Sequence, residues 1–199
     1  MEFKTSFRYF AIVCVAISVC GSGCGSGSSS SSPSADPGTA LGQRFAFSAN
    51  QPAAGWQQQL PDAGDYGVGL WTGTASGLYN IIDGAAGNYA TNGCTEIMLQ
   101  NLANTNSTAV CTLYAADCGT SANATAMFAM SQKLYTPAVT IAGYDPTIAF
   151  GNTTLDGIRS FAHFGRYYFD IDLSGYAADP TSALADATTF IGTLSSKSN

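Results

Sequence analysis

His163 is the only histidine of the chain, so a Ser-His-Asp catalytic triad would have to use it. Asp170 and Asp172 follow on a predicted strand and could orient its imidazole, with a serine from elsewhere in the chain. The sequence contains no G-x-S-x-G motif, which would place a serine nucleophile on a tight turn. A small hydrolase using His163 is therefore an alternative hypothesis, and the sequence assigns no catalytic residue.

The sequence contains no complete zinc-binding or phosphate-binding motif. Cys94, Cys111, Cys118 and His163 lack the paired spacing that is typical of zinc ligands. The run 67–69 begins like a phosphate-binding loop, but no Gly-Lys-Ser/Thr or complete G-x-G-x-x-G follows it. We therefore expect no metal site and no cofactor.

Three polar residues are candidates for contact with a ligand or a partner: Tyr79, Asp83 and Asn88. The Asp83 carboxylate either bonds to neighbouring backbone or to Tyr79, or contacts a ligand together with Asn88. The sequence leaves both interpretations open.

These candidates lie in the segment 77–93, whose apolar residues recur at helical spacing, at Leu78, Ile82, Ala85 and Tyr89. Thr74 or Ser76 can cap its start, and Gly93 can supply the left-handed residue after its end. We expect a helix over 77–92. Its small central residues favour a close approach to a sheet.

Two β-rich runs, 95–103 and 108–116, flank a polar turn and predict a hairpin. If Ala103 opposes Thr108, the numbers of facing residues sum to 211 or 212, and Cys94 lies beside Asp117 or Cys118.

We therefore expect a Cys94–Cys118 disulfide, which an exported compartment permits. Cys111 would oppose Gln100 or Asn101 as a buried free thiol. The alternative Cys111–Cys118 pairing needs a sharp reversal along one strand.

A second hairpin is predicted from the runs 157–164 and 166–173, joined at Phe164 and Gly165. A two-residue turn there pairs Arg159 with Asp170 and His163 with Arg166. Alternation divides the side chains between two faces. The core face carries Ile158, Ala162, Tyr167, Phe169 and Ile171, and the other carries Arg159, Phe161, His163, Arg166, Tyr168 and Asp170.

The fold class that these elements predict is α+β. It is a single domain over 41–199, a mainly antiparallel sheet packed by about three helices, at 77–92, 122–134 and 181–194. The turn-rich residues 41–73 favour short strands or a wrapping arm.

The N-terminus predicts where the protein is located. Residues 1–23 have the basic start and short apolar run of a signal peptide, and the run is too short to span a membrane comfortably. Cys24 fits the lipidated cysteine of a bacterial lipoprotein, and Cys20 competes for that role. An ordinary signal peptide that releases a soluble protein is the alternative.

The segment 24–40 then comprises the lipidated Cys24 and a Gly/Ser-rich tether. Removing residues 1–23 takes away two of the seven basic and one of the thirteen acidic residues, which leaves a net charge of −7. Such a surface repels nucleic acid and anionic lipid headgroups, so we expect no nucleic-acid partner. The expected contact with a membrane is through the lipid anchor, and the ligand or protein partner is not specified by the sequence.

The run 78–89, Leu-Tyr-Asn-Ile-Ile-Asp-Gly-Ala-Ala-Gly-Asn-Tyr, resembles a signature of an uncharacterised family of exported bacterial proteins, often lipoproteins. That signature reads Leu-aromatic-x-x-Ile-Asn/Asp-Gly-Ala/Gly-Ala-x-x-Tyr. Weaker matches lie at 123–128 and 165–168, and Gly87 stands where the family frequently has Glu. The resemblance covers about residues 45 to 195 and implies the fold and the exported address, with no established activity.

We therefore expect a membrane-tethered extracytoplasmic lipoprotein that acts as a ligand- or protein-binding module. The alternatives are the small hydrolase using His163 and a structural component of the envelope that binds no small ligand.

Overall fold

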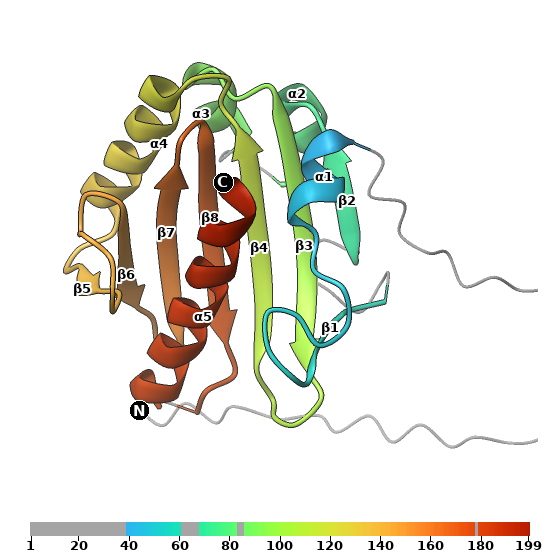
Figure 1. The fold of residues 1–199 in the computed structure, drawn as a ribbon, viewed down its shortest axis with the longest axis vertical. Coiled ribbons are helices and arrows are strands. Elements are labelled where there is room, and N and C mark those ends of the chain that lie inside the picture. Colours follow the sequence, from blue (N-terminus) through green and yellow to red (C-terminus); the bar gives the residue numbers. More distant parts are fainter. Residues whose placement is uncertain (1–38, 61–67, 83–85, 178) are drawn as a thin grey trace, which may run out of the picture. The chain divides into compact units, whose positions relative to one another are not determined.

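The fold is built around one antiparallel sheet of eight strands, seen here in a computed structural model (Figure 1). The structure describes residues 39–199, except for 61–67, 83–85 and 178. The strands are β1 (Trp56–Gln58), β2 (Leu70–Gly73), β3 (Glu96–Asn104), β4 (Val110–Asp117), β5 (Val139–Thr140), β6 (Ala149–Thr153), β7 (Ile158–Phe164) and β8 (Tyr167–Ser174). The order across the sheet is β1-β3-β4-β8-β7-β6-β5, and β2 shares the outer edge of β3 with β1.

Helices cover both faces of this sheet, because the strands carry apolar side chains on both sides. On one face lie α1 (Ala40–Phe45) and α5 (Pro180–Ser198). On the other lie α2 (Ala75–Leu78), α3 (Ala86–Thr91) and α4 (Ser121–Leu134). Figure 1 shows α5 running across one side of the strands and α4 on the opposite side. None of the helices in the described part of the chain is long and apolar enough to cross a membrane.

The predicted helix over 77–92 is not one continuous helix. Two short helices, α2 and α3, replace it, with turns from Tyr79 to Ile82 and then three residues that the structure does not describe. Gly77, Gly84 and Gly87 make one continuous helix over this segment unfavourable, since each glycine costs about 1 kcal/mol in a helix interior. The predicted cap is present, since the Thr74 hydroxyl accepts a hydrogen bond from the Gly77 amide at 3.3 Å.

The other helices agree better with their predictions. Helix α4 occupies the predicted 122–134 with one more residue at its start, and the Thr120 hydroxyl caps it through the Asn123 amide. Helix α5 begins at Pro180 after the Asp179 cap and continues to Ser198, four residues past the predicted end. Helix α1 lies in the turn-rich region and was not predicted, because it is only six residues long.

Neither hairpin has the predicted register. In β3–β4 the facing numbers sum to 213, so Cys111 opposes Leu102 and not Gln100 or Asn101. In β7–β8 the turn lies at Gly165 and Arg166, two residues lie between Phe164 and Tyr167, and His163 opposes Tyr168 instead of Arg166. A slip of two residues keeps every β7–β8 side chain on its predicted face, whereas a slip of one would exchange the faces.

Candidate functional site

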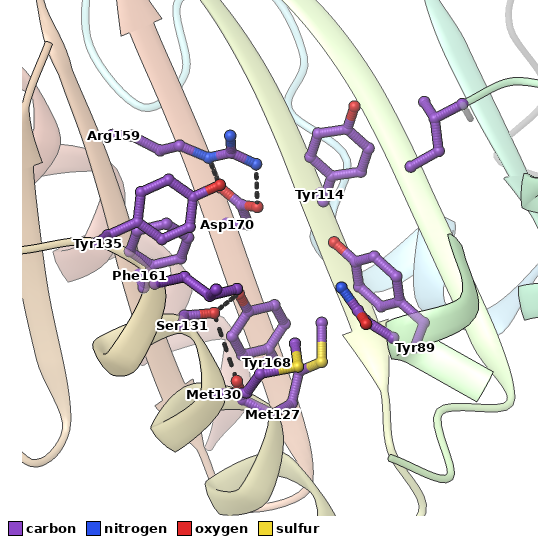
Figure 2. A pocket seen from close by; sticks show the side chains of 13 residues that line it. Tyr89, Tyr114, Met127, Met130, Ser131, Tyr135, Arg159, Phe161, Tyr168 and Asp170 are labelled. Atoms are coloured by element: carbon purple, nitrogen blue, oxygen red, sulfur yellow. Dashed lines mark hydrogen bonds and ion pairs between the residues drawn. The ribbon is translucent and has the colours of Figure 1, made fainter. Parts of the chain in front are cut away.

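A pocket of about 360 Å³ opens on the sheet face that carries α2, α3 and α4. Its volume falls in the range of small-molecule sites, roughly 300–1,000 Å³. The lining side chains come from five elements, namely α3, β4, α4, β7 and β8, and from residues beside the helices. They include five aromatic rings, two methionines and one pair of opposite charges, all drawn in Figure 2.

The charged pair at one end of the pocket is Arg159 with Asp170. The Arg159 Nε donates to Asp170 Oδ1 at 2.9 Å, and Nη2 donates to Oδ2 at 2.7 Å. The Asp170 side chain is 7 % exposed and that of Arg159 is 27 % exposed. The pair is therefore a bidentate ion pair, with the carboxylate inside and the guanidinium reaching toward the opening.

The register of β7 against β8 corrects how this pair forms. The sequence placed Arg159 directly opposite Asp170, but Arg159 faces Asp172, and Phe161 faces Asp170. The Arg159 side chain therefore reaches Asp170 along the diagonal, a distance that a long side chain can cover. The predicted contact exists, although the predicted register does not.

Aromatic rings stand on both sides of the pocket. Tyr135 and Phe161 lie together on one side, with ring centroids 4.7 Å apart. The Arg159 guanidinium lies 4.9 Å from the Tyr135 ring centre and 5.6 Å from that of Phe161, so both rings hold it by cation–π contact. Figure 2 shows Tyr89 and Tyr114 across the pocket from them.

The other end of the pocket is formed by α4. One face of this helix presents Met127, Met130 and Ser131 to the pocket, because residues three and four apart share a helix side. The buried Ser131 hydroxyl lies 2.7 Å from the Tyr168 hydroxyl, which fixes the Tyr168 ring. The Asn92 amide lies 3.5 Å from the Met127 sulfur and so links α4 to the end of α3.

Burial raises the pKa of three phenol groups of the pocket, those of Tyr89, Tyr135 and Tyr168. Burial first, and then the charge of Asp170, raise the pKa of Tyr89 and of Tyr168 well above the usual value. Burial also raises the pKa of Tyr135. Burial by itself would lower the pKa of Arg159, but the hydrogen bonds and charge of Asp170 outweigh it and raise that pKa. At neutral pH the described lining therefore carries one positive and one negative charge.

The three predicted contact residues have different positions. Asn88 lines the pocket from α3. Tyr79 is 51 % exposed and does not line the pocket. A Cβ at Gly87 would lie 2.8 Å from the Tyr79 hydroxyl, so the small residue at 87 makes room for Tyr79 rather than for the sheet. Asp83 lies outside the described residues.

His163 does not lie in the pocket. Its Nε2 is 2.9 Å from the Thr147 carbonyl oxygen, and its ring packs 4.9 Å from the Phe128 ring. Asp170, a candidate triad member, is held by Arg159 instead. Over residues 39–199, apart from the gaps named above, no group of three His, Cys, Asp or Glu residues is placed to hold a metal ion.

The cysteines have the arrangement that the sequence favoured. Cys94 and Cys118 form a disulfide that ties the segment after α3 to the end of β4, and Cys111 is buried as a free thiol. Gly93, with φ of +73°, provides the left-handed turn between α3 and Cys94. Cys24 and Cys20 lie outside the described residues.

Sequence reasoning missed the aromatic lining of this pocket. The sequence predicts a buried helical position for Tyr89 and a strand face for Phe161, and it indicates no role for Tyr114 or Tyr135. The sequence feature that could have indicated the pocket is the number of tyrosines in its predicted strands and helices. Which of these tyrosines lie close together depends on the strand order β4-β8-β7. That order brings together residues more than 40 positions apart in the chain.

Comparison with known proteins adds little to this site. No family model matches the chain. No curated protein sequence matches it. The structure is similar to the crystal structure of the extracellular domain of PknH from Mycobacterium tuberculosis, with a TM-score of 0.44, 14 % sequence identity, and 73 % of this chain and 87 % of that one covered. A similarity of this size says nothing about what this chain binds.

Proposed function

We propose that this protein is a membrane-tethered extracytoplasmic lipoprotein that binds a small ligand in the aromatic pocket. The pocket itself is the observation that supports binding most directly. It combines aromatic contact area with a fixed charged pair at one end, the arrangement by which proteins hold and orient small molecules.

The polar groups of the pocket suit binding better than catalysis. Asp170 is engaged by two hydrogen bonds from Arg159, and the Ser131 hydroxyl is engaged by Tyr168 and by the Met127 carbonyl oxygen. A nucleophile needs an adjacent base that can take its proton. Among the described lining residues, Ser131 has a phenol beside it and no histidine or free carboxylate.

The N-terminus and the disulfide support the proposed extracytoplasmic location. Residues 1–23 and Cys24 support export and lipidation, and the Gly/Ser-rich segment supports a flexible tether. The Cys94–Cys118 disulfide suits an oxidising compartment. The mass of the exported protein tests this part. We expect a chain that begins at Cys24 and carries covalent lipid, and a mature N-terminus without lipid would contradict it.

Methionine methyl resonances test the binding function. Of the four methionines, Met127 and Met130 line the pocket, whereas Met98 is buried in the core on the opposite sheet face. The exported protein, labelled at its methionine methyl groups, is titrated with a fragment set that spans neutral, anionic and cationic amphipathic molecules. We expect at least one class to shift Met127 and Met130 while Met98 stays constant.

The Met98 resonance is the control that distinguishes binding in the pocket from a change of the whole fold. A fragment that moves all three resonances equally acts on the fold and not on the pocket. If no fragment shifts Met127 and Met130 selectively, the small-ligand function is wrong, and a structural role in the envelope becomes the better hypothesis.

A further inference from the structure

The charge of the pocket restricts the kind of ligand that it can take. The only ionised groups of the described lining are Arg159 and Asp170, and they neutralise each other. Asp172 lies directly across from Arg159 on β8 and brings a second carboxylate close to the pair. Because the pair has no net charge, this end of the pocket offers an anion no net positive charge, so anionic ligands are not favoured.

A cation is disfavoured for a different reason. Both carboxylate oxygens of Asp170 already accept hydrogen bonds from the Arg159 guanidinium. A cationic ligand at this end would bring a second positive charge beside the Arg159 guanidinium, and the two like charges repel each other. The Arg159 guanidinium therefore disfavours a cationic ligand group beside the Asp170 carboxylate, although the aromatic rings alone would attract a cation.

The polar groups that remain for a ligand both donate and accept. A guanidinium has five N–H donors, and the bonds to Asp170 use one on Nε and one on Nη2. Asn88 adds an amide with both functions, and the protonated hydroxyls of Tyr89 and Tyr135 do the same. Hydroxyl groups are the ligand groups that match such a mixed set, because each one donates and accepts.

The aromatic walls of the pocket suit the apolar face of a molecule that carries such hydroxyl groups. Tyr135 presents a half-buried ring on one side, with the fully buried Phe161 packed against it, and Tyr89 and Tyr114 lie across from them (Figure 2). Aromatic faces carry partial negative charge and attract the weakly positive C–H groups on the face of a saturated ring. A ring with an apolar face and a hydroxylated edge would contact the walls with its faces and the Arg159–Asp170 pair with its edge.

We propose that the ligand is a neutral carbohydrate, with a sugar ring between the aromatic walls and its hydroxyl groups on Arg159, Asp170 and Asn88. This inference rests on the proposed small-ligand function and names the chemical class for the same pocket. It follows from one juxtaposition, that of a self-neutralised ion pair with aromatic rings on two sides.

A matched series of sugars tests the chemical class. The probes are glucose, galactose, mannose and N-acetylglucosamine as neutral rings, glucuronate as the anionic form, glucosamine as the cationic form, and indole as a flat ring without hydroxyls. Each is titrated against the methionine-labelled exported protein. We expect a neutral sugar to shift Met127 and Met130 with at least tenfold higher affinity than glucuronate or glucosamine, with Met98 unchanged.

Variants locate the binding groups. Arg159→Lys loses the planar fork and should weaken binding of the neutral sugar at least tenfold. Arg166→Lys is its matched control, because Arg166 pairs with Asp117 away from the pocket, and should bind as the parent does. Tyr135→Leu removes one aromatic wall and should also weaken binding, whereas Tyr79→Leu, at an exposed residue outside the pocket, should not.

Each contrary result has a defined meaning. Preferred binding of glucuronate, glucosamine or indole contradicts the carbohydrate assignment and leaves the small-ligand function standing. Shifts by fragments of another class, with none by the four neutral sugars, do the same. If neither the fragment set nor the sugars shift Met127 and Met130, both proposals are wrong. Equal binding by Arg159→Lys and Arg166→Lys, each folded as judged by circular dichroism, contradicts the role of the ion pair.

Discussion

Replacing Asp170 by Asn tests how the ion pair holds the pocket together. Asp170→Asn keeps the size of the side chain but removes its charge, and the new amide nitrogen meets N–H donors of Arg159 in place of an acceptor. The guanidinium keeps its two aromatic neighbours but loses its counter-charge.

The size of the effect follows from the burial of the two partners. Removing one partner of a fully buried pair costs about 3–5 kcal/mol. Here the carboxylate is almost fully buried, whereas 27 % of the Arg159 side chain is exposed, so water can still hydrate part of the positive charge. We therefore expect the free energy of unfolding to fall by about 2–3 kcal/mol, below the range for a fully buried pair.

Urea unfolding followed by circular dichroism measures this change as a shift of the midpoint at constant slope. Asp117→Asn is the control, because Asp117 pairs with Arg166, whose side chain is 52 % exposed. Its Oδ1 can still accept from the Gly119 amide, and loss of the exposed pair should cost about 1 kcal/mol or less. If Asp170→Asn loses no more stability than Asp117→Asn, the buried pair does not organise the pocket, and our reasoning is refuted.

Three further predictions concern other parts of the fold. Replacing Cys94 and Cys118 together by Ala should lower the free energy of unfolding by about 3 kcal/mol in denaturant titrations, because the bridge closes a loop with a sequence separation of 24; an unchanged midpoint would contradict this. Ser160→Ala should leave stability unchanged or raise it, because its buried hydroxyl has no partner, whereas Ser131→Ala should cost about 1–2 kcal/mol by leaving Tyr168 unbonded; the reverse order of midpoints would refute the assignment. Hydrogen bonds from Ser182 and from the Thr181 amide lower the pKa of Asp179, so its stabilisation of α5 is present above about pH 4 and is lost as pH falls through the lowered pKa; Asp179→Asn should show a smaller loss in acid unfolding curves than the parent does.

Local sequence patterns were sufficient where the structure depends on neighbours in the chain. Thr74, Thr120 and Asp179 begin helices because a short polar side chain can bond to amides two or three residues later. The division of β7 and β8 into two faces follows from their alternation alone. The disulfide pairing could be inferred because both cysteines flank one hairpin.

The local sequence pattern was not sufficient to predict the strand registers of the hairpins or the conformation of residues 77–92. A hairpin register can slip by two positions and keep every side chain on its face, so the alternation of apolar residues does not fix which residues form the turn. The helical spacing of apolar residues in 77–92 is compatible with one helix or with two short ones, and in the structure Leu78 of α2 and Tyr89 of α3 both pack into the same core.

The sequence alone determined the α+β class, the antiparallel pairing of the hairpins and the helices that became α4 and α5, since each depends on periodicity and caps within a short stretch. It did not determine the pocket. Tyr89, Tyr114, Tyr135 and Arg159 belong to four separate segments, and they meet only because β8 inserts between β4 and β7 while α3 and α4 cover the same face. Such convergence is a property of the strand order, which depends on the burial of the whole sheet between two helical layers and not on any one segment.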